Sequence, residues 1–140
     1  MNIRRLNTND YTHFLSIIND FRQTDFSFTQ FKNILNTQTH IEIYIIEKDN
    51  KIIGAGTLLF ETKFIHNISC YAHIEDIIIK KEYQGSGYGK ILIQHLVEVC
   101  HNKKCYKILL DCEPQLIPFY EKCGFKNKGN QMVNYLLSSD

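Results

Sequence analysis

In residues 1–40 the apolar positions predict one short strand followed by two helices. Apolar and polar residues alternate through residues 1–6, which favours an opening strand. Residues 8–10 are all types that favour a helix N-cap, and apolar residues then recur at helical spacing. That run consists of Tyr11, Phe14, Leu15, Ile18 and Phe21. A weaker helical pattern begins at Ser27 or Thr29 and continues to residue 35.

The next pattern is typical of a hairpin of two strands. Residues 41–47 alternate as a strand does, residues 48–51 are typical of a turn, and residues 52–65 return as a second strand. Gly54 and Gly56 interrupt that second strand. We expect a β-bulge or a close backbone approach at these glycines.

Helical and strand patterns alternate through the C-terminal half. The expected order is a strand at 73–79, a glycine-rich loop at 80–89, a helix at 90–100, a strand at 106–110 and a helix at 116–122. Gly124 follows the last helix, where a glycine commonly ends one. We expect terminal strands from residue 125 onward, including residues 132–137.

These elements predict the fold class. The order β-α-α-β-β-β-α-β-α-β indicates an α/β (mixed α+β) fold around one sheet. The chain has 140 residues, without a linker rich in Pro, Gly or Ser and without a repeat. Residues 1–140 are therefore expected to form a single domain.

Charge and hydropathy exclude several classes of partner. Sixteen Lys and Arg against fifteen Asp and Glu give a formal net charge of +1. Such a chain has no general attraction for nucleic acid. No apolar run approaches the roughly 20 residues that span a bilayer, so we expect no membrane insertion. Residues 1–10 have two arginines without an apolar stretch behind them, so we expect no secretory signal.

The cysteines and histidines argue against disulfides and metals. Five Cys are an odd number, and no two of them form a C-x-x-C pair. The six His are also scattered, so we expect no metal site. We expect reduced, mostly buried thiols in an intracellular protein.

The segment Gln84–Lys90 is the first with chemical content. Three glycines at alternate positions lie between a predicted strand and a predicted helix. Glycine lets the backbone approach a ligand closely, and the unpaired N–H groups of a helix start attract an anion. The alternative is a glycine-rich turn that binds nothing. A Walker loop and a dinucleotide fingerprint both fit this spacing badly.

Three carboxylates lie within or directly after predicted apolar strands. Glu75 and Asp76 interrupt the strand at 73–79, and adjacent strand residues point to opposite faces. At least one of them should therefore face the interior or a cleft, unless it forms a buried ion pair or lies at an edge. Asp111 follows the strand at 106–110, where open α/β sheets tend to bind ligands. Its alternative role is a helix N-cap or a turn.

The glycine loop resembles that of a known family. Gln84-x-x-Gly87-x-Gly89 is similar to the Q/R-x-x-G-x-G/A pyrophosphate loop of the GNAT acetyltransferase superfamily. Further blocks, in the same order and at about the same spacing, resemble the glucosamine-6-phosphate N-acetyltransferases within it. These blocks are residues 64–66, 73–77, 87–90, 105–108 and 119–125. The resemblance extends over roughly residues 52 to 125.

This resemblance implies a fold and an activity. The fold would be the GNAT acyl-CoA N-acyltransferase fold, with a mostly antiparallel mixed sheet flanked by helices. The reaction would be direct transfer of the acetyl group of acetyl-CoA to the amine of glucosamine 6-phosphate, without a covalent enzyme intermediate or a metal. The resemblance also implies a cytoplasmic homodimer whose C-terminal strands help complete the neighbour's sugar site.

The resemblance assigns three catalytic roles. Asp111 matches a proposed catalytic base, and Glu75 would position the amine or act as a base through water. An α-amino type of amine has a pKa of roughly 7.7–8.0, so a carboxylate of modestly raised pKa suffices to remove its proton. Tyr120 would donate a hydrogen bond or a proton to the leaving thiolate. Its residue type alone would indicate a half-buried core tyrosine.

The resemblance also assigns binding residues. The acetyl-CoA residues would be Ile77, Ile78, Ile79, Gln84, Gly85, Ser86, Gly87, Tyr88, Gly89, Lys90, Tyr120, Glu121 and Lys122. The substrate residues would be Lys63, Phe64, Ile65, His66, Glu75, Asp76, Tyr106, Lys107 and Asp111.

One departure from the family concerns the sugar phosphate. The family carries an arginine near its C-terminus, whereas residues 132–140 here contain no Arg or Lys and Tyr135 stands about where it would fall. Lys126 or Lys128 would have to compensate. Two alternatives therefore stay open: acetylation of another amino sugar or small amine, and a CoA-binding module without catalysis.

Overall fold

The computed structural model describes residues 1–138, in two compact parts that meet at the Leu110–Asp111 bond. The first part contains one five-stranded sheet in the order β1-β2-β3-β4-β5. Its strands are β1 (Asn2–Arg5), β2 (Ile41–Lys48), β3 (Lys51–Lys63), β4 (Ser69–Ile79) and β5 (Lys107–Leu109). Neighbouring strands are antiparallel except that β5 runs parallel to β4. The predicted mixed, mostly antiparallel sheet is confirmed.

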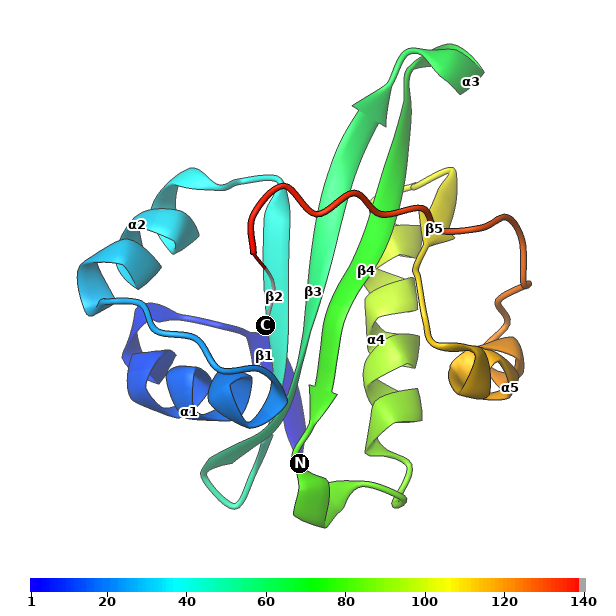
Figure 1. The fold of residues 1–140 in the computed structure, drawn as a ribbon. Coiled ribbons are helices and arrows are strands. Elements are labelled where there is room, and N and C mark those ends of the chain that lie inside the picture. Colours follow the sequence, from blue (N-terminus) through cyan, green and yellow to red (C-terminus); the bar gives the residue numbers. More distant parts are fainter. Residues whose placement is uncertain (139–140) are drawn as a thin grey trace. The chain divides into compact units, whose positions relative to one another are not determined.

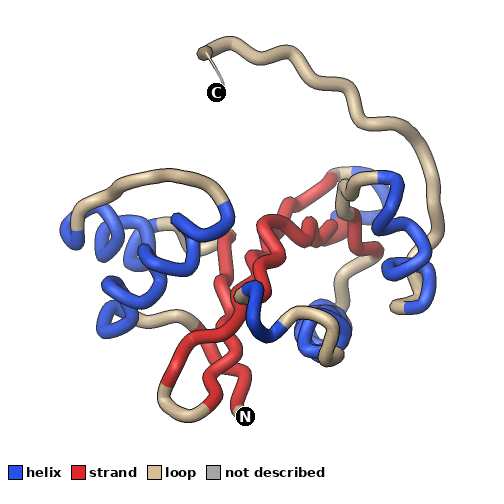
Figure 2. Tube along the Cα trace, turned by 60° about the horizontal axis from the view of Figure 1, so that its bottom comes forward, coloured by secondary structure: helices blue, strands red, loops and turns tan. Residues whose placement is uncertain are grey.

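Helices cover both faces of this sheet. The helices α1 (Tyr11–Phe21) and α2 (Phe28–Thr37) lie on one face, and α4 (Tyr88–Asn102) lies on the other (Figure 1). Figure 2 shows the strands between the α1–α2 pair and α4. Both predicted N-terminal helices are confirmed. The helix expected at 90–100 is two residues longer at each end, and Gly87 with a φ of 89° is its N-cap.

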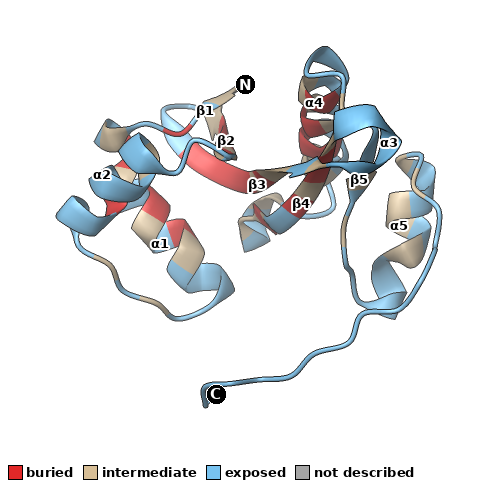
Figure 3. Ribbon diagram, turned by 90° about the horizontal axis from the view of Figure 1, so that it is seen from above, coloured by how far each residue is buried: buried red, intermediate tan, exposed pale blue. Residues whose placement is uncertain are grey.

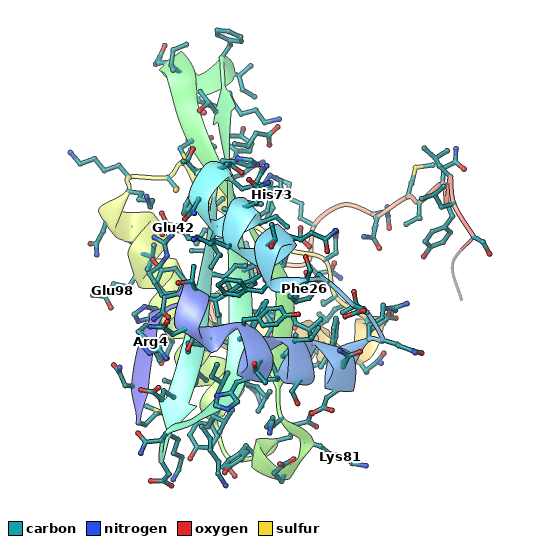
Figure 4. The ribbon with its side chains drawn as sticks, turned by 90° about the vertical axis from the view of Figure 1, so that its left-hand side faces the viewer. Arg4, Phe26, Glu42, His73, Lys81 and Glu98 are labelled. Carbon is teal, nitrogen blue, oxygen red and sulfur yellow. The ribbon has the colours of Figure 1, made fainter. Side chains whose placement is uncertain are left out.

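The core fills the space between the sheet and its helices. Figure 3 shows buried positions along α1, β3 and α4. The cluster beneath α1 and α2 consists of Leu6, Phe14, Ile17, Phe31, Ile45, Ile52, Ala55 and Ile78. Phe26 packs its ring on Phe31 at a centroid distance of 6.1 Å and lies among the side chains of this layer (Figure 4). Each fully buried aliphatic or aromatic side chain contributes roughly 1.5–3 kcal/mol.

Local hydrogen bonds explain where α2 begins. Ser27 Oγ accepts from the Gln30 backbone N–H at 3.1 Å, and the Gln30 side chain accepts from the Ser27 N–H at 2.8 Å. This capping box satisfies two N–H groups that a helix start leaves unpaired. The helix therefore begins at Phe28, and Ser27 rather than Thr29 is its N-cap.

A β-bulge follows from the glycines of β3. The register pairs Thr57 with Glu75 and Ala55 with Ile78, so two residues of β4 oppose Gly56 alone. A Cβ on Gly56 would lie 2.7 Å from Ile77 Cδ1, which only glycine avoids. The expected bulge and the expected close approach are both confirmed.

The β3–β4 hairpin differs from its predicted bounds. β3 ends at Lys63 instead of residue 65, and the short helix α3 (Ile65–Ile68) forms the tip of the hairpin, beyond the ends of β1 and β2 (Figure 1). β4 begins at Ser69 instead of residue 73. Pairing with β3 extends β4 back to Ser69. The sequence pattern did not predict these first residues of β4, because the segment before residue 73 has polar character.

The second part contains helices but no regular strand in its described residues. A 3₁₀ turn, η3 (Pro114–Leu116), leads into α5 (Ile117–Lys122), and Gly124 at φ 96° follows it as predicted. The terminal strands expected from residue 125 onward, including residues 132–137, are wrong, because residues 125–138 are irregular. A strand needs a paired neighbour, and these residues have none within their own part. Positions 139–140 lie outside the described residues.

The cysteines are free thiols, but the expectation that most are buried is wrong. Cys100 in α4 is buried, Cys70, Cys105 and Cys123 are intermediate, and Cys112 is exposed. Cys70 Sγ lies 3.5 Å from Cys105 Sγ. Burial raises the pKa of Cys100 to about 11, so this thiol stays protonated at neutral pH.

Candidate active site

The segment Gln84–Lys90 presents a run of unpaired backbone donors. The N–H groups of residues 85–90 find no acceptor among residues 1–138. Gly85 and Gly87 have φ of 80° and 89°, and a Cβ built on either would meet no atom within 4 Å. The Gln84 side chain donates to Ile79 O at 2.9 Å, which ties the loop to the end of β4. Open space and unpaired donors at the start of a fifteen-residue helix form a cradle of the kind with which helix N-termini can bind anions.

The edge of β4 beside this cradle is open. The register of β5 on β4 runs from Tyr71 to His73, so among the described residues no strand covers β4 from Glu75 to Ile79 on that side. Backbone groups there are available to an extended ligand. Figure 4 shows Lys81 beyond the end of β4 and His73 farther up, within the strand.

Neither Glu75 nor Asp76 faces the interior, because both residues are exposed, and the alternative of an edge position fits them. Asp76 has a φ of 50° in the bulge, which breaks the alternation on which the expectation of an inward-facing residue depended. The short β5 also leaves this length of β4 uncovered within residues 1–138. Both carboxylates therefore face accessible space beside the open edge.

Four predicted substrate residues lie together around one ring. Lys63 Nζ and Lys107 Nζ lie 5.3 and 4.9 Å from the centroid of Tyr71. The His66 imidazole stacks on Tyr106 at 3.9 Å, and Tyr106 stacks beside Tyr71 at 5.7 Å. The structure thus gathers cations and flat rings in one cluster, which suits a sugar bearing an anionic group.

Residues 64–68 complete the tip of this hairpin. His66, Asn67 and Ile68 all have left-handed φ, of 53°, 59° and 61°. Such a run is costly for residues other than glycine, and it turns the chain so that His66 reaches the ring of Tyr106. Phe64 and Ile65, also predicted to contact the substrate, are 89% and 58% exposed.

The cluster also includes Glu61, Tyr71 and His73, for which no role was predicted from the sequence. His73 Nε2 lies 3.0 Å from one oxygen of Glu61, and Lys63 Nζ lies 3.2 Å from the other. The bonds from His73 and then Lys63 lower the pKa of the Glu61 carboxyl. Alternate residues share a strand face, so Tyr71, His73 and Glu75 point the same way. That spacing was the signal that could have identified Tyr71 and His73.

The second part holds the other two predicted catalytic residues. Asp111 is exposed, and its Oδ2 accepts a hydrogen bond of 3.0 Å from the Gln131 side chain. Tyr120 is half-buried in α5 with its ring edge-on to Phe119 and Phe125. Burial, followed by the nearby thiols of Cys112 and Cys123, raises the pKa of the Tyr120 hydroxyl. Tyr120 therefore remains a proton donor at neutral pH, while Glu121 and Lys122 of α5 are exposed.

A comparison with known protein families covers most of the chain. The sequence pattern of the acetyltransferase (GNAT) family matches residues 3–125. This chain belongs to the GNAT family. GNAT acetyltransferases take their acetyl group from acetyl-CoA, so the enzyme class is an N-acetyltransferase with acetyl-CoA as co-substrate.

Individual GNAT relatives are similar over different lengths. Glucosamine 6-phosphate N-acetyltransferase 1 of Dictyostelium discoideum is 36% identical over 90% of this chain and 82% of its own length. The glucosamine 6-phosphate N-acetyltransferase of Arabidopsis thaliana is 36% identical over 66% of this chain, and the match spans 64% of the relative.

Solved GNAT structures resemble the chain over nearly its whole length. The crystal structure of the Arabidopsis thaliana glucosamine-6-phosphate N-acetyltransferase has a TM-score of 0.89 at 31% identity, and the match covers 96% of this chain and 97% of that one. An acetyltransferase of Trypanosoma brucei has a TM-score of 0.91 at 30% identity, with 96% and 99% covered. The GNAT fold expected from the family resemblance is therefore confirmed.

Two further features concern metal binding and membrane insertion. Within residues 1–138 no group of three or more His, Cys, Asp or Glu is arranged to hold a metal ion. None of the helices in the described part of the chain is both long and apolar enough to cross a membrane.

Proposed function

We propose that this chain is a glucosamine 6-phosphate N-acetyltransferase, which forms N-acetylglucosamine 6-phosphate and CoA for the synthesis of UDP-N-acetylglucosamine. The observation that carries the proposal is the 36% identity to the Dictyostelium discoideum enzyme of that name across 90% of this chain. The cluster around Tyr71 supports it, because its cations and rings suit a sugar phosphate.

Acetyl-CoA is assigned to the open edge of β4 and the cradle beside it. The donors of residues 85–90 would bind the pyrophosphate, with Gln84 fixing the loop. The backbone of Ile77, Ile78 and Ile79 would bind the pantetheine arm along the strand edge that β5 leaves open. The exposed residues Glu121 and Lys122, together with Tyr120, would contact the cofactor end of the site.

The sugar phosphate is assigned to the face that carries Glu75. Lys63 and Lys107 supply cations, while His66 and Tyr106 supply stacked rings. Phe64 and Ile65 complete the substrate side at the exposed hairpin tip. Glu75 and Asp76 would bind hydroxyl or amine groups, since both carboxylates are exposed beside the open edge.

The proposed chemistry needs only side chains and the two substrates, so no metal ion is required. The amine attacks the thioester carbonyl, Asp111 removes the proton that the attacking nitrogen loses, and Glu75 holds the amine in place. Tyr120 donates a hydrogen bond or a proton to the departing thiolate, and its raised pKa keeps the hydroxyl protonated at neutral pH. Both substrates bind together, and Cys112 forms no acyl intermediate.

Assembly and location belong to the same proposal. The two parts would act as one domain, because the family match extends from residue 3 to residue 125 across their boundary. Two chains would form a homodimer through residues 132–137, whose apolar side chains are exposed. Five free thiols support a reducing, cytoplasmic location.

An amine panel tests the proposed substrate. Thiol release from acetyl-CoA is measured with glucosamine 6-phosphate, glucosamine, other amino sugars and small amines. We expect glucosamine 6-phosphate to give the highest kcat/KM, with a marked loss when the phosphate is removed. A higher value for another amine would assign the chain to a different acetyltransferase activity, which the absence of Arg and Lys from residues 132–140 favours as the second candidate. CoA binding without turnover on any amine would indicate a binding module.

A further inference from the structure

Tyr71 stands in β4 between a lysine of β3 and a lysine of β5. The register pairs Tyr71 with Glu61 in β3 and with Lys107 in β5. Lys63 lies two residues beyond Glu61, so all four side chains project from the same face of the sheet. Tyr71 is only 5% exposed, and its ring is therefore held firmly in position.

Both lysine ammonium groups lie over this one ring. The distances to the Tyr71 centroid are 5.3 Å for Lys63 Nζ and 4.9 Å for Lys107 Nζ. Both are within the roughly 6 Å at which the negative face of an aromatic ring attracts a cation. A lysine has many rotamers, so a fixed attractive surface determines where its charge lies.

The cluster has more positive than negative charge. Lys63 Nζ shares the Glu61 carboxylate with His73, at 3.2 and 3.0 Å. Within residues 1–138 Lys107 forms no ion pair. Two like charges held near one ring repel each other, and an oxyanion bound by both ammonium groups would offset that repulsion. A phosphate has several oxygens and up to two negative charges, so it can accept hydrogen bonds from more than one ammonium group.

We propose that Tyr71 is a positioning residue that holds Lys63 and Lys107 where they bind the phosphate of the substrate amine. The inference rests on the proposed function, because it takes a sugar phosphate as the substrate. Tyr71 acts through the two lysines and touches no reacting atom. It therefore affects affinity for phosphorylated substrates and not the rate of acetyl transfer.

Two substitutions at Tyr71 separate the ring from the hydroxyl. Tyr71→Leu removes the aromatic face and keeps an apolar side chain, whereas Tyr71→Phe keeps the face. Phe60→Leu is the matched control. Phe60 lies in β3 outside the cluster, and Lys103 Nζ lies 4.8 Å from the centroid of its ring. Each variant is assayed with glucosamine 6-phosphate and with glucosamine.

We expect Tyr71→Leu to raise KM for glucosamine 6-phosphate about fivefold to tenfold, with kcat and KM for acetyl-CoA unchanged. KM for glucosamine should not change. Tyr71→Phe and Phe60→Leu should behave as the wild type. In a chain that already carries Lys63→Gln and Lys107→Gln, Tyr71→Leu should cause no further rise, because its effect passes through those lysines.

Other results would overturn the inference. An equal rise in KM for both sugars would show a general structural role, and an unchanged KM for the sugar phosphate would show no role at all. If circular dichroism shows that Tyr71→Leu does not fold, Tyr71→Met is used instead. The same rise in KM for glucosamine 6-phosphate alone is expected, and the same two results would overturn the inference. A wild-type chain that does not acetylate glucosamine 6-phosphate would overturn the proposed function itself, before any variant is made.

Discussion

At the scale of single residues, Asp111 carries the most specific chemical assignment. It is an exposed carboxylate with one hydrogen bond from Gln131. Its neighbour Glu113, also exposed, serves as a matched carboxylate without an assigned role. The pair allows a change of charge at the proposed base to be compared with the same change two positions along the chain.

Asp111→Asn should lower kcat about 10²-fold to 10⁴-fold, because it removes the group that accepts the amine proton. Acetyl-CoA affinity, measured by calorimetry, should stay as in the wild type. Glu113→Gln and Cys112→Ala should retain most of the activity in a thiol-release assay. An unchanged kcat in Asp111→Asn would exclude this residue as the base, and complete loss in Cys112→Ala would indicate a covalent route.

Glu42 is a residue with a structural role and a pH dependence. It is only 7% exposed, with Lys103 Nζ at 2.8 Å, the Tyr44 hydroxyl at 2.7 Å and Arg5 at 3.5 Å. Burial alone would raise its pKa, but the bonds from Lys103 and Tyr44 outweigh that effect and lower it below 4.5. Its contribution to stability is therefore complete above that value and is lost as the pH falls through the folded pKa.

Glu42→Gln should destabilise the fold by about 1.5–3 kcal/mol at pH 7, because it leaves a hydrogen-bonded cation without its partner. The difference in Tm from the wild type should shrink as the pH falls below about 4.5. Glu98→Gln, at a carboxylate on the exposed face of α4 (Figure 4), is the control and should have little effect. A Tm difference that does not depend on pH would contradict this assignment.

At the scale of elements, Gly87 links the loop conformation to coenzyme binding. Its φ of 89° is strained for any residue with a Cβ, but a Cβ there meets no atom within 4 Å. Gly87→Ala should therefore leave the fold intact while it disturbs the donors of residues 85–90. Gly129 offers the same test without a ligand, with a φ of 81° and the same open space.

We expect Gly87→Ala to weaken CoA binding about tenfold or more in calorimetry, through altered N–H directions and a methyl group in the path of the pyrophosphate. Gly129→Ala should bind CoA as the wild type does. Both variants should lose a similar, small amount of thermal stability, about 1 kcal/mol. Equal CoA affinity in the two variants would show that residues 85–90 are not the pyrophosphate site.

Local signals explain which elements could be predicted from the sequence. The helices, the turn at Asp49 and Asn50 and the bulge at Gly56 depend on periodicity, caps and backbone freedom, which neighbouring residues specify. The exposure of Glu75 depends instead on how far β5 extends along β4, and no local pattern encodes that length. The prediction of terminal strands was wrong because residues 132–137 have strand-forming side chains but no strand partner within their part.

Some residues of the candidate site could likewise be identified from the sequence, and others could not. The glycine loop was identified because its function resides in consecutive residues. The lysines and the rings of His66 and Tyr106 were assigned by resemblance, and the structure brings them together. Tyr71, the residue at the centre of their cluster, was missed because its importance comes from contacts between three strands.

At the scale of the whole molecule, the exposed C-terminal side chains predict an association between chains. Five large apolar residues lie within six positions: Met132, Val133, Tyr135, Leu136 and Leu137. Their exposed fractions range from 57% for Val133 to 93% for Met132. An apolar surface of this kind commonly marks an interface.

We expect light scattering to give a mass of two chains at micromolar concentration. A Leu136→Asp substitution should shift the protein to a monomer and raise KM for the sugar phosphate, because a charge in an apolar interface is costly. Phe21→Asp, at another exposed apolar residue, should leave the mass unchanged. A monomeric wild type would contradict the proposed homodimer.

The most direct measurement is identification of the product by mass spectrometry. The purified chain is incubated with acetyl-CoA and glucosamine 6-phosphate, and the released CoA is quantified in parallel. We predict N-acetylglucosamine 6-phosphate, with one acetyl group on nitrogen and one CoA released for each molecule formed. CoA release without an acetylated sugar, or no reaction while other amines are acetylated, would contradict the proposed function.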